Sequence, residues 1–386
     1  MRILYGVVGE GMGHATRSRV VLEHLLAAGH EVRVVVSGRA HGFLSSRFAG
    51  RKGIAFEAIH GLVLGFEGNA VDKSETLRLN LESLPSGLLE NIAVYRKVAE
   101  DAFEPEVVIS DFETWAYLYG LNHRLPVISI DNMQVLNRCR HDAEVTEGRS
   151  AAFRLAKALV KGKLPFAWHY LVASFFFPPV RKKKTTLIPP ILRPEILSAK
   201  REPGSHVLVY QTAASNAALI PTLQTLPYEF RLYGMGREGR EGNVTLKAFS
   251  ETGFIDDLRT ARAAVAGGGF SLMGEAVHLH VPLMSLPISG QFEQVLNARY
   301  LERLGYGAHA EQLDADSIAA FIARSDEHAH ALSRYVPHDN GMLFGCVDEL
   351  LRRVAAGEDA PDALDAPAMG KYGDEADAPD ADDTDD

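Results

Sequence analysis

The sequence predicts an α/β protein with two doubly wound domains that face each other across a cleft, followed by a disordered acidic tail. Short apolar runs alternate with helical stretches over residues 1–190, and the alternation starts again over residues 205–357. Uniformly apolar runs of this length are typical of parallel strands that are buried on both faces. Between the halves, TTLIPPILRPEILSAKREPGS carries four prolines and mixed charges, so we expect a linker at residues 191–204.

The first half opens with the predicted strand RILYGVV, a glycine-rich loop and a helix in HATRSRVVLEHLLAAGH. Apolar residues recur in this helix at helical spacing (Val20, Val21, Leu25 and Leu26), and Gly29 closes it. The runs EVRVVVSG, IAFEAI, EVVIS and PVISI predict further strands, each next to a helical stretch. Ligands of doubly wound sheets bind at the carboxyl ends of the strands, so we expect the site in the cleft between the two domains.

The second half repeats this order. Its predicted strands are HVLVYQ, EFRLYG, VTLKAF, AAVAG and PLMSLP. Helices are predicted from about Asn216, in FIDDLRTA, from Phe270 and in FEQVLNARYLERLG, and LFGCVDELLRR predicts the last helix, which ends near Val354. This alternation predicts a second parallel sheet covered by helices.

Charge is concentrated at the end of the chain. The formal net charge is -10, and the segment from Glu358 onward holds twelve acids against Lys371, a balance of -11, which leaves about +1 for residues 1–357. A nearly neutral body favours no nucleic-acid partner. The composition of residues 358–386 predicts a disordered, solubilising tail. Two cysteines without CxxC spacing, and an N-terminus without a signal peptide, favour a cytoplasmic protein.

One segment raises the question of a membrane. Residues 164–184, LPFAWHYLVASFFFPPVRKKK, combine aromatic residues with four cations, Arg181 to Lys184, but His169 and two prolines interrupt the apolar core. Peripheral contact with the anionic inner face of a membrane is one interpretation. A buried strand from Tyr170 to Phe176, followed by a basic surface turn, is the interpretation that we favour.

The stretch AGGGFSLMGEAVHLHVPLM carries the strongest functional signal. Gly267 to Gly269 follow a predicted strand and precede a predicted helix. Glycine backbone lets a phosphate approach the unpaired amides at a helix start, where the helix dipole is positive. Ser271 adds a hydroxyl donor, and Glu275 lies one turn further along, where a carboxylate accepts hydrogen bonds from the vicinal hydroxyls of a ribose. We therefore expect a nucleoside diphosphate site here.

Neighbouring segments extend this site. Glu293, Gln294 and Asn297 in ISGQFEQVLNA are predicted at the start of the next helix, where polar side chains can bind sugar hydroxyls. Upstream, ETGFIDDLRTA provides Phe254 and Ile255, against which a planar base can lie.

These motifs carry a family resemblance. GFIDDLRTARAAVAGGGFSLMGE resembles the donor-binding segment of MurG-type glycosyltransferases, which have the two-domain GT-B fold of Rossmann-like units. EQVLNA resembles the Asp-Gln-x-x-Asn element of the UDP-glycosyltransferases, with Glu293 in the acidic position. GEGMGHATRS resembles the glycine-rich loop after their first strand, including His14. These segments span both domains in the order of the family.

The resemblance implies a role for each matching residue. Ile255 would contact the nucleobase, Gly268, Gly269, Phe270 and Ser271 the diphosphate, Glu275 the ribose, and Glu293 and Gln294 the donor sugar, while Gly11 and Gly13 lie in the loop near phosphate and acceptor. The chain departs from the pattern at Gly267, where plant-type enzymes have a histidine. Retaining enzymes tend to have a glutamate at that position, so its absence favours an inverting transfer. No proline follows the histidine of the first loop.

An inverting transfer needs a base for the acceptor hydroxyl. We expect His14 to act as this base, because a histidine has a near-neutral pKa, and Asp111 in VVISDFETW to orient it. Glu113 and Glu10 are alternatives for the orienting acid. Amides of the helix would stabilise the leaving diphosphate, so no metal or other cofactor is expected. The DAD segment, Asp314 to Asp316, is interpreted as a helix N-cap rather than a metal site.

Other functions stay open at this point. GVVGEGMGHATR resembles a dinucleotide-binding loop, but His14 takes the place of its last glycine, which disfavours an oxidoreductase. A sugar-nucleotide epimerase of the same fold and a non-catalytic sugar-nucleotide binder are the remaining alternatives. The acceptor (a lipid, a glycan or a small aglycone), the donor sugar and the oligomeric state are not predicted. Residues 60–100 and 132–165 are expected to form the acceptor pocket.

Overall fold

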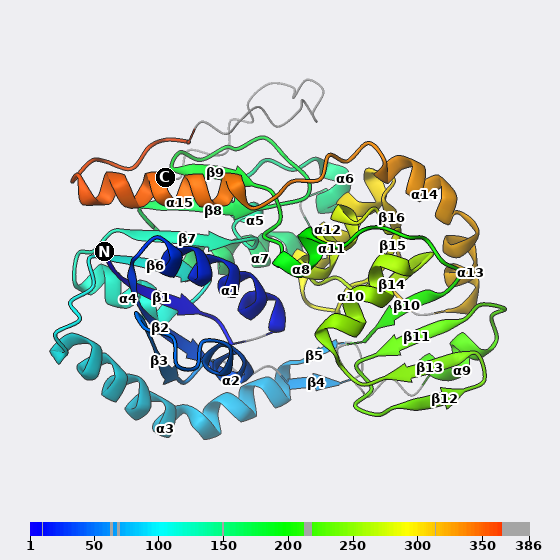
Figure 1. The fold of residues 1–386 in the computed structure, drawn as a ribbon, viewed down its shortest axis with the longest axis horizontal. Helices are drawn as coiled ribbons and strands as arrows, with labels where there is room; N and C mark the ends of the chain where they lie inside the picture. The colour runs from blue at the N-terminus through cyan, green and yellow to red at the C-terminus, as the bar shows by residue number, and fades with distance from the viewer. Residues whose placement is uncertain are drawn as a thin grey trace.

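The computed structural model describes residues 1–9, 11–61, 65–67, 70–148, 150–211, 218–312 and 314–364. Two seven-stranded sheets form the centres of two α/β domains that lie side by side (Figure 1). Helices cover the faces of both sheets. The predicted fold class, two Rossmann-like domains in the GT-B arrangement, is confirmed.

The first sheet is parallel throughout, and its strand interiors are buried. Reading across the sheet, the strands are β3 (Ile54–Ile59), β2 (Glu31–Ser37), β1 (Arg2–Val7), β6 (Val107–Asp111), β7 (Val127–Asp131), β8 (His169–Ala173) and β9 (Thr185–Ile188). The order reverses between β1 and β6, which is the switch point at which such sheets bind ligands.

In the described part of the first domain, the helices between these strands are α1 (Met12–Ala27), α2 (Gly38–Arg47), α3 (Lys73–Glu100), α4 (Thr114–Asn122), α5 (Val135–Arg138), α6 (Ala143–Thr146) and α7 (Ala151–Lys163). A small antiparallel pair, β4 (Gly65–Glu67) and β5 (Ala70–Asp72), precedes α3. Part of the predicted acceptor segment 60–100 lies outside the described residues. The predicted strand Tyr170 to Phe176 corresponds to β8 and the buried residues that follow it.

The second sheet runs in the order β12 (Gly239–Glu241), β13 (Val244–Lys247), β11 (Phe230–Tyr233), β10 (Val207–Tyr210), β14 (Ala263–Gly267), β15 (Leu283–Leu286) and β16 (Gly307–His309). Its strands are parallel except for β12, which pairs antiparallel with β13. The helices are α9 (Leu219–Gln224), α10 (Glu251–Thr260), α11 (Phe270–His278), α12 (Phe292–Arg303), α13 (Ala315–Ala323) and α14 (Ser325–Leu332). The short helix α8 (Pro194–Leu197) lies in the predicted linker.

The last helix, α15 (Gly341–Ala355), crosses back to the first domain (Figure 1). The ring of Phe344 stacks on His24 of α1 with centroids 4.2 Å apart, and Nε2 of His24 lies 2.7 Å from Oδ1 of Asp348. Residues 205–357 were expected to form the second domain, so α15 is a correction to that boundary. Its apolar face predicted a packed helix but did not indicate which surface it covers.

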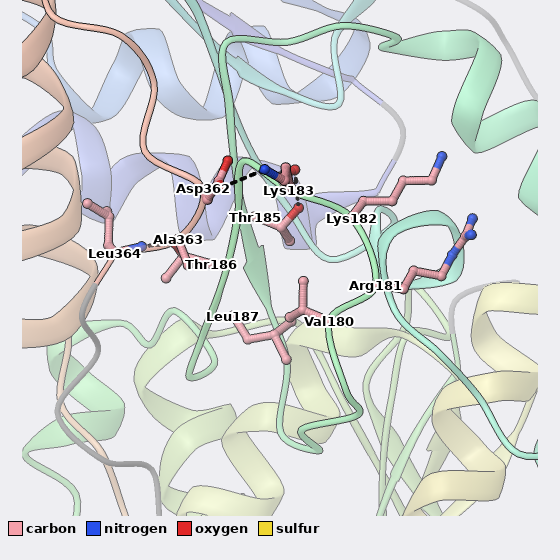
Figure 2. A pocket seen from close by; sticks show the side chains of 10 residues that line it. All are labelled: Val180, Arg181, Lys182, Lys183, Thr185, Thr186, Leu187, Asp362, Ala363 and Leu364. Atoms are coloured by element: carbon pink, nitrogen blue, oxygen red, sulfur yellow. Dashed lines mark hydrogen bonds and ion pairs between the residues drawn. The ribbon is translucent and has the colours of Figure 1, made fainter. Parts of the chain in front are cut away.

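The segment after α15 also contacts the first domain. The amide of Thr185 in the edge strand β9 donates to the carbonyl of Asp362 (3.0 Å), and the amide of Leu364 donates to Oγ1 of Thr186 (2.9 Å) (Figure 2). Covering an edge strand in this way blocks unwanted strand pairing. The first residues of the predicted tail, 358–364, therefore belong to the folded body, and the rest of the tail lies outside the described residues.

Side chains of the two domains meet directly. The rings of Phe176 and Tyr300 stack with centroids 3.9 Å apart, and Nδ1 of His141 lies 2.9 Å from the hydroxyl of Tyr300. The buried ring of Phe175 packs near Phe270 of α11. The aromatic residues 175–176, considered above for membrane contact, therefore form part of the domain interface instead. No helix of the described residues is both long and apolar enough to cross a membrane.

Candidate functional site

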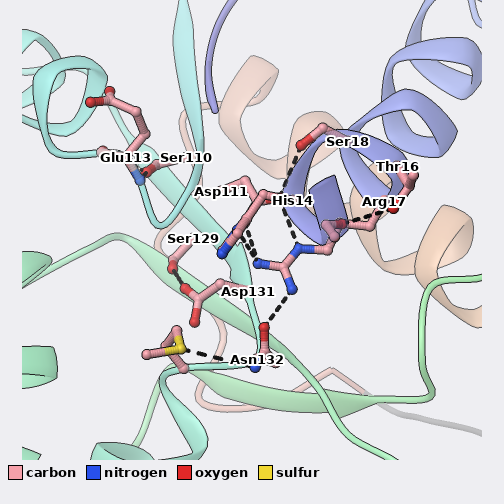
Figure 3. A network of polar contacts seen from close by, with 12 residues as sticks. His14, Thr16, Arg17, Ser18, Ser110, Asp111, Glu113, Ser129, Asp131 and Asn132 are labelled. Atoms are coloured by element: carbon pink, nitrogen blue, oxygen red, sulfur yellow. Dashed lines mark hydrogen bonds and ion pairs between the residues drawn. The ribbon is translucent and has the colours of Figure 1, made fainter. Parts of the chain in front are cut away.

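The glycine-rich loop and the end of β6 open at the same sheet edge. In the parallel register of β1 and β6, Val7 is opposite Asp111. Gly11 precedes α1 with a φ of 86°, a conformation that favours glycine, and no side chain caps the helix. This turn places His14, in the first turn of α1, beside Asp111 (Figure 3).

His14 and Asp111 form the pair that the sequence predicted. Nδ1 of His14 lies 2.8 Å from Oδ1 of Asp111, and their side chains are 17% and 1% exposed. Burial opposes ionisation of Asp111, but the charges of Arg17 and His14 outweigh it and hold the pKa of Asp111 well below its usual range. Asp111 is therefore a carboxylate across the physiological pH range.

Arg17 is the first of the residues at this site that sequence reasoning missed. Its Nε donates to Oδ2 of Asp111 (2.8 Å), and Oγ of Ser18 donates to the same oxygen (2.9 Å). Burial first, and the charge of Arg17 second, lower the pKa of His14, although Asp111 partly opposes them. The signal was present in HATR, because Arg17 is three residues after His14 and so lies on the same face of the helix.

The position of Arg17 bears on the tautomer of His14. Nη2 of Arg17 lies 2.6 Å from Nδ1 of His14 as well as next to Oδ1 of Asp111. A guanidinium only donates, and the charged carboxylate is a better acceptor than a neutral imidazole. With Arg17 donating to Asp111, the Nδ1–H of His14 also donates to Asp111, and Nε2 is left as an acceptor.

The network continues into the second domain. Nη1 of Arg17 donates to Oδ1 of Asn132, which follows β7, and Nδ2 of Asn132 donates to Oε1 of Glu293 at the start of α12 (2.5 Å). Nδ2 of Asn297 donates to the same oxygen (2.6 Å). Glu293, expected to bind the donor sugar, thus contacts two amides in this structure, one of them from the first domain.

Glu293 has an unusual protonation equilibrium. Burial raises the pKa of Glu293 to about 7, although the hydrogen bond from Asn297 and the charge of Arg17 oppose the shift. Glu293 therefore takes up or releases a proton near neutral pH. The next residue, Gln294, serves a different purpose, because its Oε1 accepts from the amides of Gly268 (3.2 Å) and Ile288 (3.0 Å).

The three glycines between β14 and α11 are not equivalent. A Cβ on Gly268 would lie 2.4 Å from Cβ of Gln294, whereas a Cβ on Gly269 would meet open space. Gly268 is thus needed for the close packing of α12, and its amide is already bonded to Gln294. Gly269 precedes α11 without a side-chain cap. The expected phosphate contact of Gly268 is therefore replaced by a structural one.

The first turns of α1 and α11 face each other across the domain interface. A Cβ on Gly13 would lie 2.6 Å from Oγ of Ser271. Two helix N-termini, neither of them capped by a side chain, therefore converge at one place. Unpaired amides and two positive dipole ends make such a place suited to an anion. The side chain of Phe270 is buried, so only its backbone is available there.

Glu275 is paired with a residue from the linker. Nε and Nη2 of Arg193 donate to Oε1 and Oε2 of Glu275, both at 2.8 Å, and Glu275 is 6% exposed. A carboxylate has further lone pairs, so a ribose contact through Glu275 requires that it be shared with Arg193. Sequence reasoning missed Arg193 because the linker gave no sign that it contacts α11.

Phe254 and Ile255 lie inside the second domain rather than at its surface. They are 5% and 6% exposed, and the ring of Phe254 packs against Tyr210 and Tyr233 with centroids 5.6 and 5.1 Å apart. The expectation that a base lies against these side chains therefore needs correction. Their apolar character reflects the core-facing side of α10.

The alternative orienting acids differ from Asp111. Glu113 caps α4, because its carboxylate accepts from the amides of Trp115 (2.8 Å) and Ala116 (2.6 Å). Figure 3 shows its side chain directed away from His14. Glu10 lies outside the described residues. Among the described residues, Asp111 is the candidate acid that contacts the histidine.

The predicted N-cap at Asp314 is confirmed. Oδ1 of Asp314 accepts from the amide of Ser317 (2.7 Å) at the start of α13. Within the described part of the chain, no group of three or more His, Cys, Asp or Glu side chains is arranged to hold a metal ion.

Comparison with known proteins agrees with this architecture. The crystal structure of the glycotransferase of kitacinnamycin superimposes with a TM-score of 0.63 and 18% identity, covering 91% of this chain and 98% of that one. LpCGTa, crystallised in complex with UDP, superimposes with a TM-score of 0.63 and 13% identity, covering 92% and 99%. At these identities the likeness shows the fold.

Sequence relatives point to the same class of protein. An uncharacterized glycosyltransferase of Methanosarcina acetivorans is 25% identical over 337 residues, which cover 80% of this chain and 85% of the relative. The model of the family described as glycosyl transferase family 1 matches residues 1–325. Because this match spans most of the sequence and both sheets, the chain belongs to glycosyl transferase family 1.

Proposed function

We propose that this glycosyltransferase transfers a sugar, with inversion, from a nucleotide diphosphate donor to an acceptor hydroxyl, and that His14 is the general base. One observation carries the proposal: His14, paired with Asp111 at the end of β6, lies in the first turn of α1, and this turn abuts the first turn of α11. A candidate base and a helix terminus suited to an anion thus lie on the two sides of one domain interface.

The chemistry follows from the protonation states. The lowered pKa keeps His14 neutral at pH 7, and its hydrogen bond to Asp111 leaves Nε2 free to accept a proton. As the acceptor oxygen bonds to the anomeric carbon, its proton moves to Nε2, and the bond from that carbon to the β-phosphate oxygen breaks. Asp111 stabilises the imidazolium that forms.

The leaving diphosphate would be bound at the converging helix termini. Amides of Gly269 and the residues that follow it, together with the hydroxyl of Ser271, are suited to its charge, and Gly11 and Gly13 line the opposite side. We propose that this binding needs no metal. The UDP bound to LpCGTa supports uracil as the base of the donor.

Glu293 would bind the donor sugar only after its contact with Asn132 is exchanged. The amide of Asn132 and the hydroxyl of a sugar are both donors to a carboxylate, so a sugar hydroxyl can replace the amide without loss of a hydrogen bond. Gln294 instead shapes the turn that holds Gly268. The proposal thus divides donor contacts between Glu275, Glu293 and the helix amides.

The test is a screen of nucleotide sugars for release of nucleoside diphosphate, with EDTA present in a parallel set. We expect metal-independent release from a UDP-sugar, loss of turnover by about 10²-fold or more in His14→Ala, and retained UDP binding. His41→Ala in α2, outside the His14 network, is the matched control. Isomerised donor without released UDP would indicate an epimerase. Binding without conversion of any donor would indicate a binding protein, and retained turnover in His14→Ala would refute the base assignment.

A further inference from the structure

Helix α7 has apolar residues on two sides. One side packs against the protein, and the opposite side faces solvent. Its inner side packs through Phe153 and Val160, which are 6% and 3% exposed. On the opposite side, Leu155 and Leu159 are 61% and 64% exposed. They are four residues apart, so they lie next to each other on the helix. The outer residues between and beside them, Ala151, Ala158 and Gly162, carry no charge either.

The loop that follows α7 adds an aromatic residue to this apolar face. Phe166 is 82% exposed, three residues after the end of the helix. The loop is anchored on both sides, because Leu164 and Ala167 are buried and the hydroxyl of Tyr117 donates to the carbonyl of Pro165. Because the loop is anchored, it keeps the large apolar side chain of Phe166 exposed to solvent.

Positive charge borders this apolar face. The helix contains Arg154, Lys157, Lys161 and Lys163 and no acid. Lys182, after β8, lies close to this border, since burial, Arg181, Lys161, Arg138 and Lys157 lower its pKa to about 8. Arg181 and Lys182 are among the residues that line the pocket of about 490 Å³ in which Lys183 pairs with Asp362, and in Figure 2 their side chains extend away from Asp362.

The nature of the partner follows from this arrangement. A second copy of the chain would bring two basic borders together, which Coulomb repulsion disfavours. A helix with exposed leucines, a neighbouring aromatic residue and basic flanks is instead the composition of helices that lie in the interface of an anionic bilayer. We propose that α7 and Phe166, bordered by Lys157, Lys161 and Lys182, dock the chain on an anionic lipid surface.

This surface differs from the one that the sequence suggested. Within residues 164–184 Phe166 is the most exposed large apolar side chain, at 82%, whereas Tyr170, Phe175 and Phe176 are buried. The helix before that segment supplies the rest of the apolar face. Docking involves no turnover, so a failure of this proposal leaves the proposed transfer reaction untouched, and the reverse also holds.

The experiment is co-sedimentation of the full chain with vesicles of phosphatidylcholine, alone or with 30 mol% phosphatidylglycerol (about a third anionic lipid). We expect at least about tenfold tighter binding to the anionic vesicles, and release in 0.5 M salt (about three times physiological ionic strength). The variant Leu155→Ser/Leu159→Ser/Phe166→Ser should lose at least about tenfold in affinity. Phe249→Ser and Val336→Ser, at positions that are 67% and 60% exposed elsewhere, are matched controls that should bind like the wild type.

Three results would overturn the proposal. Equal binding to neutral and anionic vesicles would remove the role of the basic border. Unchanged binding of the triple variant would remove the role of the apolar face. A lipid-free dimer of the wild-type chain that the triple variant converts to a monomer, seen by sedimentation velocity, would assign the face to a second copy. Because the three replaced side chains are exposed, the variant should keep its melting temperature, and the single variants should each lose part of the affinity.

Discussion

The side-chain amide of Asn132 donates a 2.5 Å hydrogen bond to Oε1 of Glu293, and this bond joins the two domains within the candidate site. Through Arg17, Asn132 is also linked to the His14–Asp111 pair. The candidate base and the acid expected to bind the donor sugar therefore belong to one hydrogen-bond network. A change at one end of such a network affects the other end more strongly than it would if the contacts were independent.

The protonation of Glu293 should be visible in the pH dependence of stability. Its pKa is raised by burial from an ordinary value near 4.5 to about 7, so the folded chain binds a proton that the unfolded chain releases between these values. This contribution is fully present below the unfolded pKa and is lost as the pH rises through 7, a change of at most about 3 kcal/mol. Glu293→Gln removes the titration and keeps an amide that can accept from Asn132.

We therefore expect the melting temperature of Glu293→Gln to exceed that of the wild type by more at pH 8 than at pH 5.5. Differential scanning calorimetry at both pH values measures this. Glu311→Gln, at an exposed glutamate of the same domain, is the control and should follow the wild type. Parallel profiles for wild type and Glu293→Gln would show that Glu293 titrates normally.

Arg17 should set the position of the acidic limb of the pH profile, which is the pH range in which kcat/KM falls as the pH is lowered. A general base works in its unprotonated form, so activity is lost as the pH falls through the pKa of His14. Burial and the charge of Arg17 lower that pKa, so Arg17→Gln should raise it and move the limb to higher pH. Arg17→Lys keeps the charge and should keep the limb near its wild-type position, with a lower kcat because the two-point contact with Asp111 is lost.

The control for Arg17 is Arg19→Gln, at a buried arginine of the same helix that pairs with Glu23 and Glu195 instead. It should alter stability without moving the limb. A limb that stays in place in Arg17→Gln would separate Arg17 from the protonation of His14. The measurement is the pH profile of kcat/KM with the donor found in the screen.

The two glycines before α11 should respond differently to an added methyl group. Gly268→Ala brings Cβ within 2.4 Å of Cβ of Gln294, so we expect a loss of about 1–3 kcal/mol in unfolding free energy. Gly269→Ala meets open space, so its melting temperature should hold. If a phosphate approaches the backbone at this position, the same methyl group should weaken UDP binding by about tenfold. Calorimetric titration with UDP decides between a ligand-contacting and a structural glycine at residue 269.

The sequence predicted those parts of the site that depend on strand ends. His14 follows one strand and Asp111 ends another, and the alternation of apolar runs places both strands in one parallel sheet, whose strands bring their carboxyl ends to one edge. The turn at Gly267 to Gly269 was recognised for the same reason. Local pattern is enough for such features because the topology of doubly wound sheets is nearly fixed.

Local sequence patterns do not predict pairings between residues that are far apart in the chain. Arg193 lies 82 residues from Glu275, and Asn132 lies 161 residues from Glu293, so no periodicity relates the partners. Helix α15 is amphipathic, but an apolar stripe does not identify the surface that it covers. Phe254 shows the opposite limit, since an aromatic residue near a nucleotide site is as compatible with core packing as with base stacking.

The pairing of Glu275 with Arg193 separates a structural role from a ligand-binding one. Because the pair is buried and bidentate, Glu275→Ala should cost about 3–5 kcal/mol by leaving Arg193 without its partner. Glu275→Gln keeps the shape and loses only part of the pair, so it is the variant for binding studies.

If Glu275 accepts from the ribose, the wild type should bind UDP more tightly than 2′-deoxy-UDP by about tenfold, and Glu275→Gln should bind both alike. Calorimetric titration of the four combinations gives the coupling energy directly. If the wild type and Glu275→Gln show the same preference for UDP over 2′-deoxy-UDP, the role of Glu275 is only to hold Arg193 of the linker. Arg193→Lys is the control, since it loosens the pair but leaves the carboxylate in place, and the preference should survive in it.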